Sequence, residues 1–222
     1  MRQIQVLYEN DVCMVLNKPS GLAVQGGEGV TTSLDSILSQ LYNRRPLLVH
    51  RLDKDTSGLI LVAKEKEAAG LISGILQSVI KYYLAVAVGI PNPQNGIIKL
   101  DLNIRGQIKK SKTSYKVIAS SSKNENMVFS LLDLEPGTGR MHQIRRHLCL
   151  IKHPILGDDK YGDFSLNKQL RKSMGLKRLL LHASRLIIPP IPSVLPEGLD
   201  INAAPPDYFK NFLQDNFNYF ID

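Results

Sequence analysis

The chain has 222 residues, of which 43% are hydrophobic, so it can form a proper core, and wholesale disorder is excluded. It carries 28 Lys and Arg residues against 20 Asp and Glu residues, a formal net charge of +8 at pH 7. This excess favours a polyanionic partner. Nucleic acid fits better than a membrane, because no apolar run approaches the roughly 20 residues of a spanning helix.

The N-terminal half predicts short strands and two helices from the period of its apolar residues. Thr32 and Ser33 are both suitable N-caps for the first helix. The residues before the first strand form no signal-peptide apolar segment, which favours a cytoplasmic protein. Strands are expected at 4–9, 12–18, 47–52, 59–64 and 81–89, and helices at 31–42 and 65–80.

The C-terminal half predicts further strands, a hairpin and two helices. Strands mostly follow one another without intervening helices, which favours an α+β fold with a mixed, mainly antiparallel sheet flanked by helices and loops. No clear domain boundary and no phosphate-binding glycine motif is present. We expect a strand at 97–102, a basic loop at 105–114, a hairpin of 115–120 and 127–135, an amphipathic helix at 139–151, core strands at 178–191 and a helix at 205–217.

A knot of charge, His50-Arg51-Leu52-Asp53-Lys54-Asp55, stands between two strand-like runs and is closed by Thr56-Ser57-Gly58. A strand end followed by Thr-Ser-Gly is a rigid place from which to present a side chain such as Asp53. A surface turn of solvated charges explains the same spacing equally well. On spacing alone, both interpretations stay open.

The segment GRMHQIRRH carries a second charged cluster. His142, Arg145 and Arg146 stand at i, i+3 and i+4, which predicts one shared helix face, while Arg140 and His147 lie off that face. An ordinary basic helix surface, a phosphate-binding face and a buried arginine that holds a carboxylate all fit this pattern.

A metal site is not expected. His142 and His147 are five residues apart, which is poor spacing for one helix face. Cys13 and Cys149 are too few for a four-ligand site or a disulfide framework, and we expect two buried thiols.

Two neighbouring tyrosines are further candidates for the functional site. In a strand, Tyr82 and Tyr83 face opposite sides, so one can face a cleft, although packing explains both residues as well.

Scattered cations are the last group of candidates. They fit phosphate contacts, although solvated surface charge explains any single one of them slightly better. They are Arg44, Arg45, Arg105, Lys109, Lys110, Lys112, Lys168, Arg171, Lys172, Lys177 and Arg178.

Four stretches, HRLDKDTSGLILVAK, KYYLAVAVG, GRMHQIRRHLCLIKHPILGDDKYGD and KRLLLHAS, closely resemble the RluA-type RNA pseudouridine synthases. NKPSGLAV matches the N-terminal signature of that family. The resemblance extends over about residues 4–190, and HRLD-x-x-TSG followed by GR-x-HQ-[IL]-R is far more specific than a single short motif.

The resemblance implies that the protein isomerises uridine in RNA to pseudouridine, exchanging the C1′–N1 bond for C1′–C5, with no cofactor and no metal. Asp53 matches the catalytic aspartate, and attack at C1′, attack at C6 and elimination to a glycal all stay open. Tyr83 matches the tyrosine that stacks on the target base, and Arg145 the basic partner of the aspartate. Ile144 matches an apolar residue of the family that packs against the ring of the target base. Arg51 matches the arginine that fills the gap left by the flipped nucleotide.

The expected substrate-binding set also includes His50, Arg140, His142, Lys109 and Lys110. Many relatives carry an N-terminal S4 RNA-binding domain. We expect residues 1–222 to form a single catalytic domain without one, acting as a monomer on a stem-loop of ribosomal RNA or tRNA. The stretches HQIRRHL and GLKRLLLHAS weakly favour the members of the family that act on tRNA.

Two rival functions remain at this point. One is a non-catalytic RNA-binding module of the same fold, against which the intact Asp53, Tyr83 and Arg145 argue. The other, more distant, is a hydrolase that uses Asp53 and His142.

Overall fold

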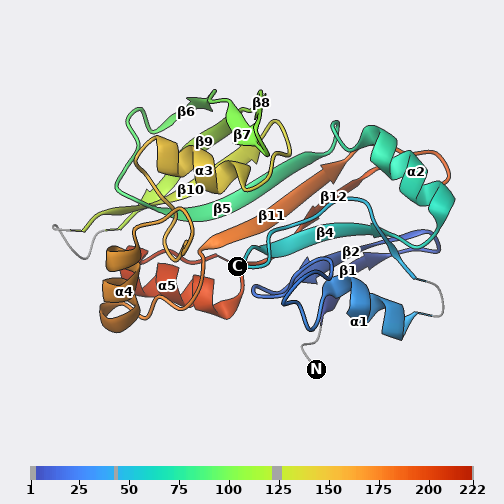
Figure 1. The fold of residues 1–222 in the computed structure, drawn as a ribbon, viewed down its shortest axis with the longest axis horizontal. Coiled ribbons are helices and arrows are strands. Elements are labelled where there is room, and N and C mark those ends of the chain that lie inside the picture. The colour runs from blue at the N-terminus through green and yellow to red at the C-terminus, as the bar shows by residue number, and fades with distance from the viewer. Residues whose placement is uncertain (1–3, 43–44, 122–126, 222) are drawn as a thin grey trace. The chain divides into compact units, whose positions relative to one another are not determined.

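The computed structural model describes residues 4–42, 45–121 and 127–221, which form two compact units (Figure 1). The first unit comprises Met1–Lys81 and Ala183–Ala203, and the second comprises Tyr82–His182 and Ala204–Asp222. Each unit contains antiparallel strand pairs and helices, which confirms the predicted α+β class.

The first unit is built on a sheet in which β1 (Gln5–Glu9), β2 (Cys13–Lys18), β4 (Ser57–Ala63) and β11 (Leu181–Ile188) follow one another in this order. The β1–β2 and β2–β4 pairs are antiparallel, as sequential strands joined by short turns usually are. Two short strands extend the sheet: β3 (Leu47–Leu48) pairs with β4, and β12 (Leu199–Asn202) pairs with β11.

Two helices belong to this unit, α1 (Leu34–Leu41) and α2 (Lys66–Ile75). Ser33 caps α1, and its side chain and that of Ser36 satisfy each other's backbone N–H groups in a capping box. Ala68 and Ile72 of α2 pack against alternate residues of β2 and β4 in one apolar cluster. Burial of this stripe, rather than helix propensity alone, holds α2 in place.

Two predictions in the first unit were too long. The strand expected at 47–52 shrinks to β3, because the chain leaves the ladder before the charged knot. The helix expected at 65–80 ends at Ile75, where a turn begins with Ser78 N–H donating to Ile75 O. Val79 is then buried in the core, and Ile80 opens the next strand.

The second unit has a sheet in the order β5 (Ile80–Val88), β10 (Phe129–Pro136), β9 (Thr113–Ser120) and β6 (Asn95–Ile98), with residues Tyr82 onwards of β5 belonging to this unit. The helix α3 (Gln143–Leu150) covers one face (Figure 1). The helices α4 (Phe164–Ser173) and α5 (Asp207–Phe217) cover the other.

Alternation along the strands explains this three-layer arrangement. Ala85, Ala87 and Leu132 lie in the apolar cluster that contains Ile144 and Leu148 of α3. The intervening strand residues point to the opposite face, as the period of two requires. There they join the aromatic side chains of α5; the cluster includes Val86, Phe129, Leu131, Phe209, Phe212 and Phe217.

The structure corrects the prediction for 105–114, which was expected to be a loop. Its first residues belong to a two-stranded hairpin of β7 (Leu102–Ile104) and β8 (Gln107–Lys109). Arg105 and Gly106, at the turn, both have positive φ, 52° and 82°, which suits a two-residue hairpin turn. This hairpin thus displays the basic residues on a defined element.

Three further outcomes concern the C-terminal half. The long hairpin is confirmed as β9 and β10, while the loop tip expected at 121–126 lies outside the described residues from 122 onwards. The terminal helix is confirmed as α5. The helix α4 was not predicted, although Asp163 caps it by accepting from Leu166 N–H. No helix in the described residues is long and apolar enough to cross a membrane.

Candidate functional site

The charged knot forms a tight turn in the first unit, directly before β4. Thr56 N–H donates to Asp53 O at 3.2 Å, which closes the turn. Asp53 is half-buried, whereas Arg51, Lys54 and Asp55 are exposed. The nucleophile expected from the resemblance therefore lies in a compact turn with charged residues around it.

A buried lysine holds this turn by its backbone. Lys18 has no exposed surface, and its Nζ donates to Leu22 O at 2.9 Å, Pro19 O at 3.0 Å and Lys54 O at 3.1 Å. These three acceptors take all three N–H bonds of the ammonium group. Burial lowers the pKa of Lys18 to about 7, and the negative charges of Asp55 and Asp53 oppose that shift.

Other residues of the NKPSG loop form hydrogen bonds to the same turn. Gly21 N–H donates to Lys54 O at 2.8 Å, and the Ser20 hydroxyl donates to Asp55 O at 2.8 Å. All these bonds end on carbonyl oxygens of the turn. The loop at 17–21, quoted for its resemblance to the family signature, thus positions the backbone around Asp53.

His50 anchors the other side of the knot. Its Nε2 accepts the backbone N–H of Leu61 in β4 at 2.9 Å. Burial, with the positive charge of Lys81 adding to it, lowers the pKa of His50 to about 3, so the ring is neutral at physiological pH. His50 therefore holds the turn onto β4, and a direct RNA contact by this residue stays a prediction.

Gly58 explains the end of the Thr-Ser-Gly motif. Its φ is +110°, and a Cβ built there would stand 2.2 Å from Ala183 O in β11. Only glycine permits this approach of two backbones. The motif that follows Asp53 is therefore fixed by strand packing as well as by the turn.

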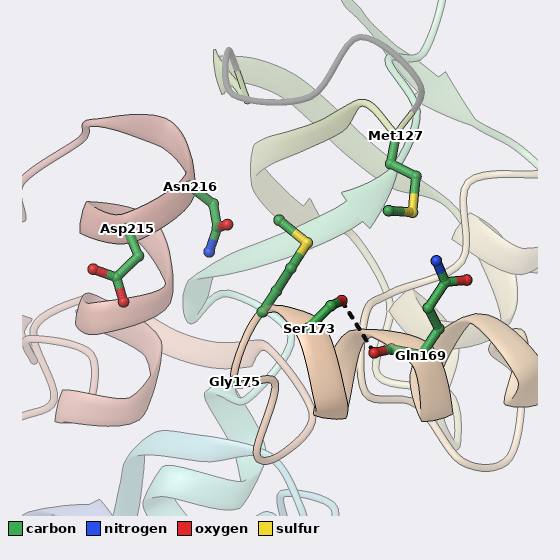
Figure 2. A pocket seen from close by; sticks show the side chains of 7 residues that line it. Met127, Gln169, Ser173, Gly175, Asp215 and Asn216 are labelled. Carbon is green, nitrogen blue, oxygen red and sulfur yellow. Dashed lines mark hydrogen bonds between the residues drawn. The ribbon is translucent and has the colours of Figure 1, made fainter.

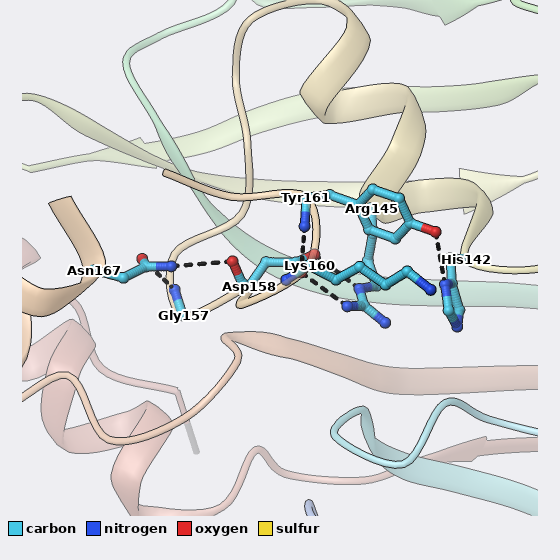
Figure 3. Close-up of polar contacts among 7 residues, drawn as sticks. All are labelled: His142, Arg145, Gly157, Asp158, Lys160, Tyr161 and Asn167. Carbon is cyan, nitrogen blue, oxygen red and sulfur yellow. Dashed lines mark hydrogen bonds and ion pairs between the residues drawn. The ribbon is translucent and has the colours of Figure 1, made fainter. Parts of the chain in front are cut away.

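In the second unit, Arg145 lies in a buried ion pair (Figure 3). Its Nε donates to Asp158 Oδ2 and its Nη2 to Asp158 Oδ1, each at 2.8 Å. Arg145 is 7% exposed and Asp158 is 1% exposed. A bidentate pair fixes the plane of the guanidinium group. Of the three interpretations left open by the sequence, the buried arginine that holds a carboxylate is the one observed.

Asp158 is itself held by several partners. Its Oδ1 accepts the backbone N–H groups of Lys160 and Tyr161, at 2.9 and 3.0 Å. Burial alone would raise the pKa of Asp158, but hydrogen bonds from Arg145 and these amides, with the charge of Arg145, lower it overall. The carboxylate is therefore charged in the fold. Asn167 Nδ2 donates to Asp158 O at 3.0 Å and secures its backbone.

An aromatic residue completes this cluster (Figure 3). The guanidinium carbon of Arg145 lies 5.2 Å from the centre of the Tyr161 ring, a cation–π distance. The Tyr161 hydroxyl and His142 Nδ1 are 2.9 Å apart and hydrogen-bonded. Sequence reasoning assigned no role to Asp158 or Tyr161, although both stand in the GDDKYG segment that carried part of the resemblance.

The predicted face of His142, Arg145 and Arg146 is wrong. His142 has φ of 52° and precedes the helix, so α3 begins only at Gln143. His147, expected off this face, is fully buried, and its ring nitrogens bond Thr113 Oγ1 and Leu100 O, each at 2.9 Å. It ties α3 to the sheet.

Tyr83 lies on the α3 face of the sheet. It pairs with Leu134 in β10 and packs against the apolar cluster that contains Ile144. Tyr82, the preceding residue, points to the other side, as strand geometry requires. The structure thus brings Tyr83 and Ile144 together, next in sequence to Arg145.

The scattered candidate cations are exposed, except that Arg44 lies outside the described residues, and Arg146 in α3 is half-buried. Arg140 Nε donates to Lys110 O at 3.3 Å, which links the start of α3 to the segment after β8. Lys109 ends β8, and both Lys109 and Lys110 are exposed. Arg146 Nη1 donates to Asn103 O in β7 at 3.0 Å. A basic surface therefore surrounds the hairpin, as phosphate binding requires.

The two cysteines differ in burial. Cys13 is buried, which raises the pKa of its thiol, while Cys149 is half-buried. Within the described residues, no group of three or more His, Cys, Asp or Glu side chains is placed to hold a metal ion.

A cavity of about 520 Å³ in the second unit is lined by residues of α4 and α5 and by Met127 (Figure 2). Two methionine side chains, Met127 and Met174, line it together with polar side chains. Ser173 donates its hydroxyl to Gln169 O within the helix. Among the described lining residues, Asp215 is the one carboxylate and none is a base, so the cavity offers no acid–base pair.

Comparisons with known proteins agree with the sequence motifs. A family model described as RNA pseudouridylate synthase matches residues 12–149, which include Asp53, Tyr83 and Arg145. The ribosomal large subunit pseudouridine synthase C of Rickettsia typhi is 36% identical over 224 residues, covering 94% of this chain and 70% of that protein. Its namesake from Salmonella typhimurium is 40% identical over 199 residues, covering 82% and 60%.

The fold has solved relatives as well. The structure titled human RNA pseudouridylate synthase domain containing 4 superposes with a TM-score of 0.75 at 28% identity, covering 95% of this chain and 92% of that one. A second human structure, of RNA pseudouridylate synthase domain containing 1, gives a TM-score of 0.75 at 26% identity, covering 92% and 84%.

Proposed function

Because the chain belongs to the RNA pseudouridylate synthase family, a family of RNA isomerases, we propose that it converts uridine in ribosomal RNA to pseudouridine with Asp53 as the nucleophile. The names of its relatives refer to the large ribosomal subunit, which favours ribosomal RNA over the tRNA that the basic stretches suggested. The net charge of +8 supports a polyanionic substrate.

The observation that carries the role of Asp53 is how its turn is held. Lys18, Gly21 and Ser20 all bind backbone carbonyls of the turn. A carboxylate is a weak nucleophile that depends on positioning. A turn fixed through its main chain supplies that positioning.

The target uridine must leave its stack to meet this carboxylate, at a cost of a few kcal/mol. Arg51, exposed two residues before Asp53, takes the vacated place between neighbouring bases in our proposal. Its planar guanidinium can stack on bases as well as bind phosphate. The flipped base then stacks on Tyr83 and packs against Ile144, two residues that share one apolar cluster.

Arg145 pairs with Asp53 in the proposed catalytic state. Enclosure by RNA removes water and would raise the pKa of a carboxylate, whereas a neighbouring guanidinium lowers it. Asp158 supports this role, because its bidentate bonds fix the orientation of Arg145 before RNA arrives. Arg145 then presents its positive charge to the Asp53 carboxylate in a fixed direction.

The two units act together as one catalytic domain in this proposal, and the protein works as a cytoplasmic monomer without a metal or cofactor. A local stem-loop suffices as substrate, since unpaired bases are where RNA is read most readily. Full turnover in EDTA is the matching expectation. Loss of turnover in EDTA that one divalent ion restores, and a polyamine does not, would contradict it.

The test is tritium release from ribosomal RNA labelled at C5 of uridine, since forming the C1′–C5 bond displaces that hydrogen. Wild-type protein should release tritium, and Asp53→Asn should bind the RNA without release. RNA binding with no release by wild type would instead indicate a non-catalytic binding module. Shortened RNA fragments without release would indicate a hydrolase.

A further inference from the structure

A surface pocket of about 330 Å³ lies in the second unit, beside the edge strand β6 and beyond the C-terminal end of α3. Arg145 stands in the first turn of α3, whereas the pocket meets Ile151 after its last residue. The volume is at the lower end of the range for small-ligand pockets, the scale of one nucleobase with its sugar. Its lining includes Asn92, Ile97, Lys99, Leu100, Tyr115 and His153.

An immobilised aromatic ring forms one wall of this pocket. The Tyr115 hydroxyl donates to Pro93 O at 3.0 Å. Gly96 is its register partner on β6, and a Cβ built at Gly96 would stand only 3.0–3.2 Å from the Tyr115 ring and hydroxyl. The ring therefore lies on bare backbone and is already fixed. A fixed ring loses little conformational entropy when a flat ligand stacks on it.

Polar groups converge on the same space. His153 Nδ1 donates to Val88 O at 2.8 Å, so in the neutral ring Nε2 is the acceptor. Asn92 lines the pocket and is exposed, so its side-chain amide offers both a donor and an acceptor. A flat apolar surface with a few donors and acceptors at its edge matches a nucleobase better than an aliphatic chain.

The surroundings match the phosphates of such a ligand. Lys99 is exposed in the pocket wall, and the chain runs from Lys99 and Leu100 into the β7–β8 hairpin. That hairpin exposes Arg105 and Lys109. Leu100 O also accepts from His147 and Ser111, so the foot of the hairpin is clamped to α3. The pocket and the basic hairpin are therefore neighbouring parts of one supported surface.

We propose that this pocket binds an unpaired base of the substrate RNA in addition to the target uridine. Tyr115 provides the stacking surface, Asn92 and His153 meet the edge of the base, and the hairpin binds the adjoining phosphates. This inference rests on the proposed function for the identity of the partner, and it adds a second base-reading subsite. Base stacking on an aromatic residue contributes affinity for every base, because every base has a π-face.

The test separates the base from the phosphates. Single-stranded RNA of about eight nucleotides, within the usual site size, is compared with an abasic ribose-phosphate oligomer of the same length, both in the Asp53→Asn background. Tyr115→Leu should weaken binding of the RNA by at least about fivefold and leave the abasic oligomer unchanged. Tyr115→Phe should retain most of the affinity. Replacing Lys109 and Lys110 with alanine should weaken both oligomers alike.

Two controls guard this result. Ile97→Trp fills the pocket from a position that is 56% exposed, so folding is preserved, and it should reproduce the Tyr115→Leu pattern. Tyr83→Leu reports on the base at Asp53. If the two sites are independent, the losses from Tyr83→Leu and Tyr115→Leu multiply in the double variant.

An equal loss on both oligomers, or no loss, for both Tyr115→Leu and Ile97→Trp overturns the inference. So does a concentration-dependent dimer that Tyr115→Leu abolishes without base-dependent binding, since the pocket would then bind a second copy. Tritium release by wild type judges the proposed function separately. Release without base-dependent loss at Tyr115 removes only the subsite, and base-dependent loss without release removes only the catalytic role.

Discussion

The turn at Asp53 and the cluster at Arg145 are held in opposite ways. Around Asp53, the supporting bonds from Lys18, Gly21 and Ser20 end on backbone carbonyls. Around Arg145, the supporting bonds are donated by its own side chain to the Asp158 carboxylate. In our proposal this difference suits a group that reacts and a group that orients it: main-chain anchoring fixes the position of Asp53, whereas side-chain anchoring fixes the direction of the charge on Arg145.

The largest expected effect comes from replacing Asp53, the proposed nucleophile. Asp53→Asn keeps the shape of the side chain and every backbone bond of the turn. Turnover should fall by about three orders of magnitude or more, as for other nucleophiles, while RNA binding and the melting temperature stay near those of wild type. Single-turnover rates, with mass spectrometry to exclude deamidation back to aspartate, provide the measurement. Wild-type turnover in the intact Asn variant would refute the assignment.

Arg145→Met should lose orders of magnitude in single-turnover rate, with an acid limb displaced to higher pH. It should also lose stability, about 3–5 kcal/mol, because Asp158 is left as an uncompensated buried charge. The matched control is Arg145→Met with Asp158→Asn, which should recover stability but not rate. Arg145→Lys should keep part of the single-turnover rate, since lysine retains the positive charge but not the bidentate N–H donors of the guanidinium group. A control that also recovers the rate would show that Arg145 acts only in folding.

Lys18→Met tests whether the backbone bonds of Lys18 position Asp53. It removes three donors from buried carbonyls and should cost about 1–3 kcal/mol of unfolding free energy per acceptor that stays unsatisfied. The turn should loosen, so the single-turnover rate falls while the affinity for RNA changes little. Chemical denaturation and saturating single-turnover kinetics measure the two effects. A stability loss with an unchanged rate would show that backbone anchoring does not position Asp53.

His50 predicts a pH dependence of stability. Its pKa in the fold, about 3, lies below the ordinary 6.5, so the unfolded chain takes up the proton first. The contribution of neutral His50 is fully present above pH 6.5 and is lost as pH falls towards 3. Wild type should therefore lose more stability on acidification over this window than His50→Gln. Parallel denaturation series at several pH values test this, and equal slopes for the two proteins would contradict it.

The smallest effect concerns the exposed cations. Replacing Lys109 and Lys110 together should flatten the dependence of log K on log salt by up to about 2 if both contact phosphate. Replacing Lys168 and Lys172 in α4, on the other face of the second unit, is the matched control and should change the slope less. An unchanged slope for the hairpin variant would mean that the hairpin faces away from the RNA.

The sequence predicted those parts of the fold that depend on local pattern. The sequence pattern predicted the strands β2, β4 and β5 from their apolar runs and the helix α1 from its apolar stripe. It also predicted the hairpin of β9 and β10. The start of α3 was misplaced because His142 adopts a left-handed conformation that no apolar period reveals. The β7–β8 hairpin was missed because its charged residues obscure any alternation.

The sequence motifs led to the proposed site residues but not to the contacts that support them. Asp53, Tyr83 and Arg145 followed from resemblance, whereas the partner of Arg145 at Asp158 lies thirteen residues away, across a turn. The role of Lys18 was also missed, because lysine is almost never fully buried and its acceptors are backbone atoms that carry no sequence signal. Such contacts depend on tertiary structure and cannot be read from spacing.

The central claim is tested most directly by mapping pseudouridines in total RNA from a strain that lacks this protein, after incubation with wild type or Asp53→Asn. We predict new pseudouridine at defined positions of the large-subunit ribosomal RNA with wild type, and none with Asp53→Asn. No new pseudouridine with wild type, or the same positions modified by both proteins, would contradict the account.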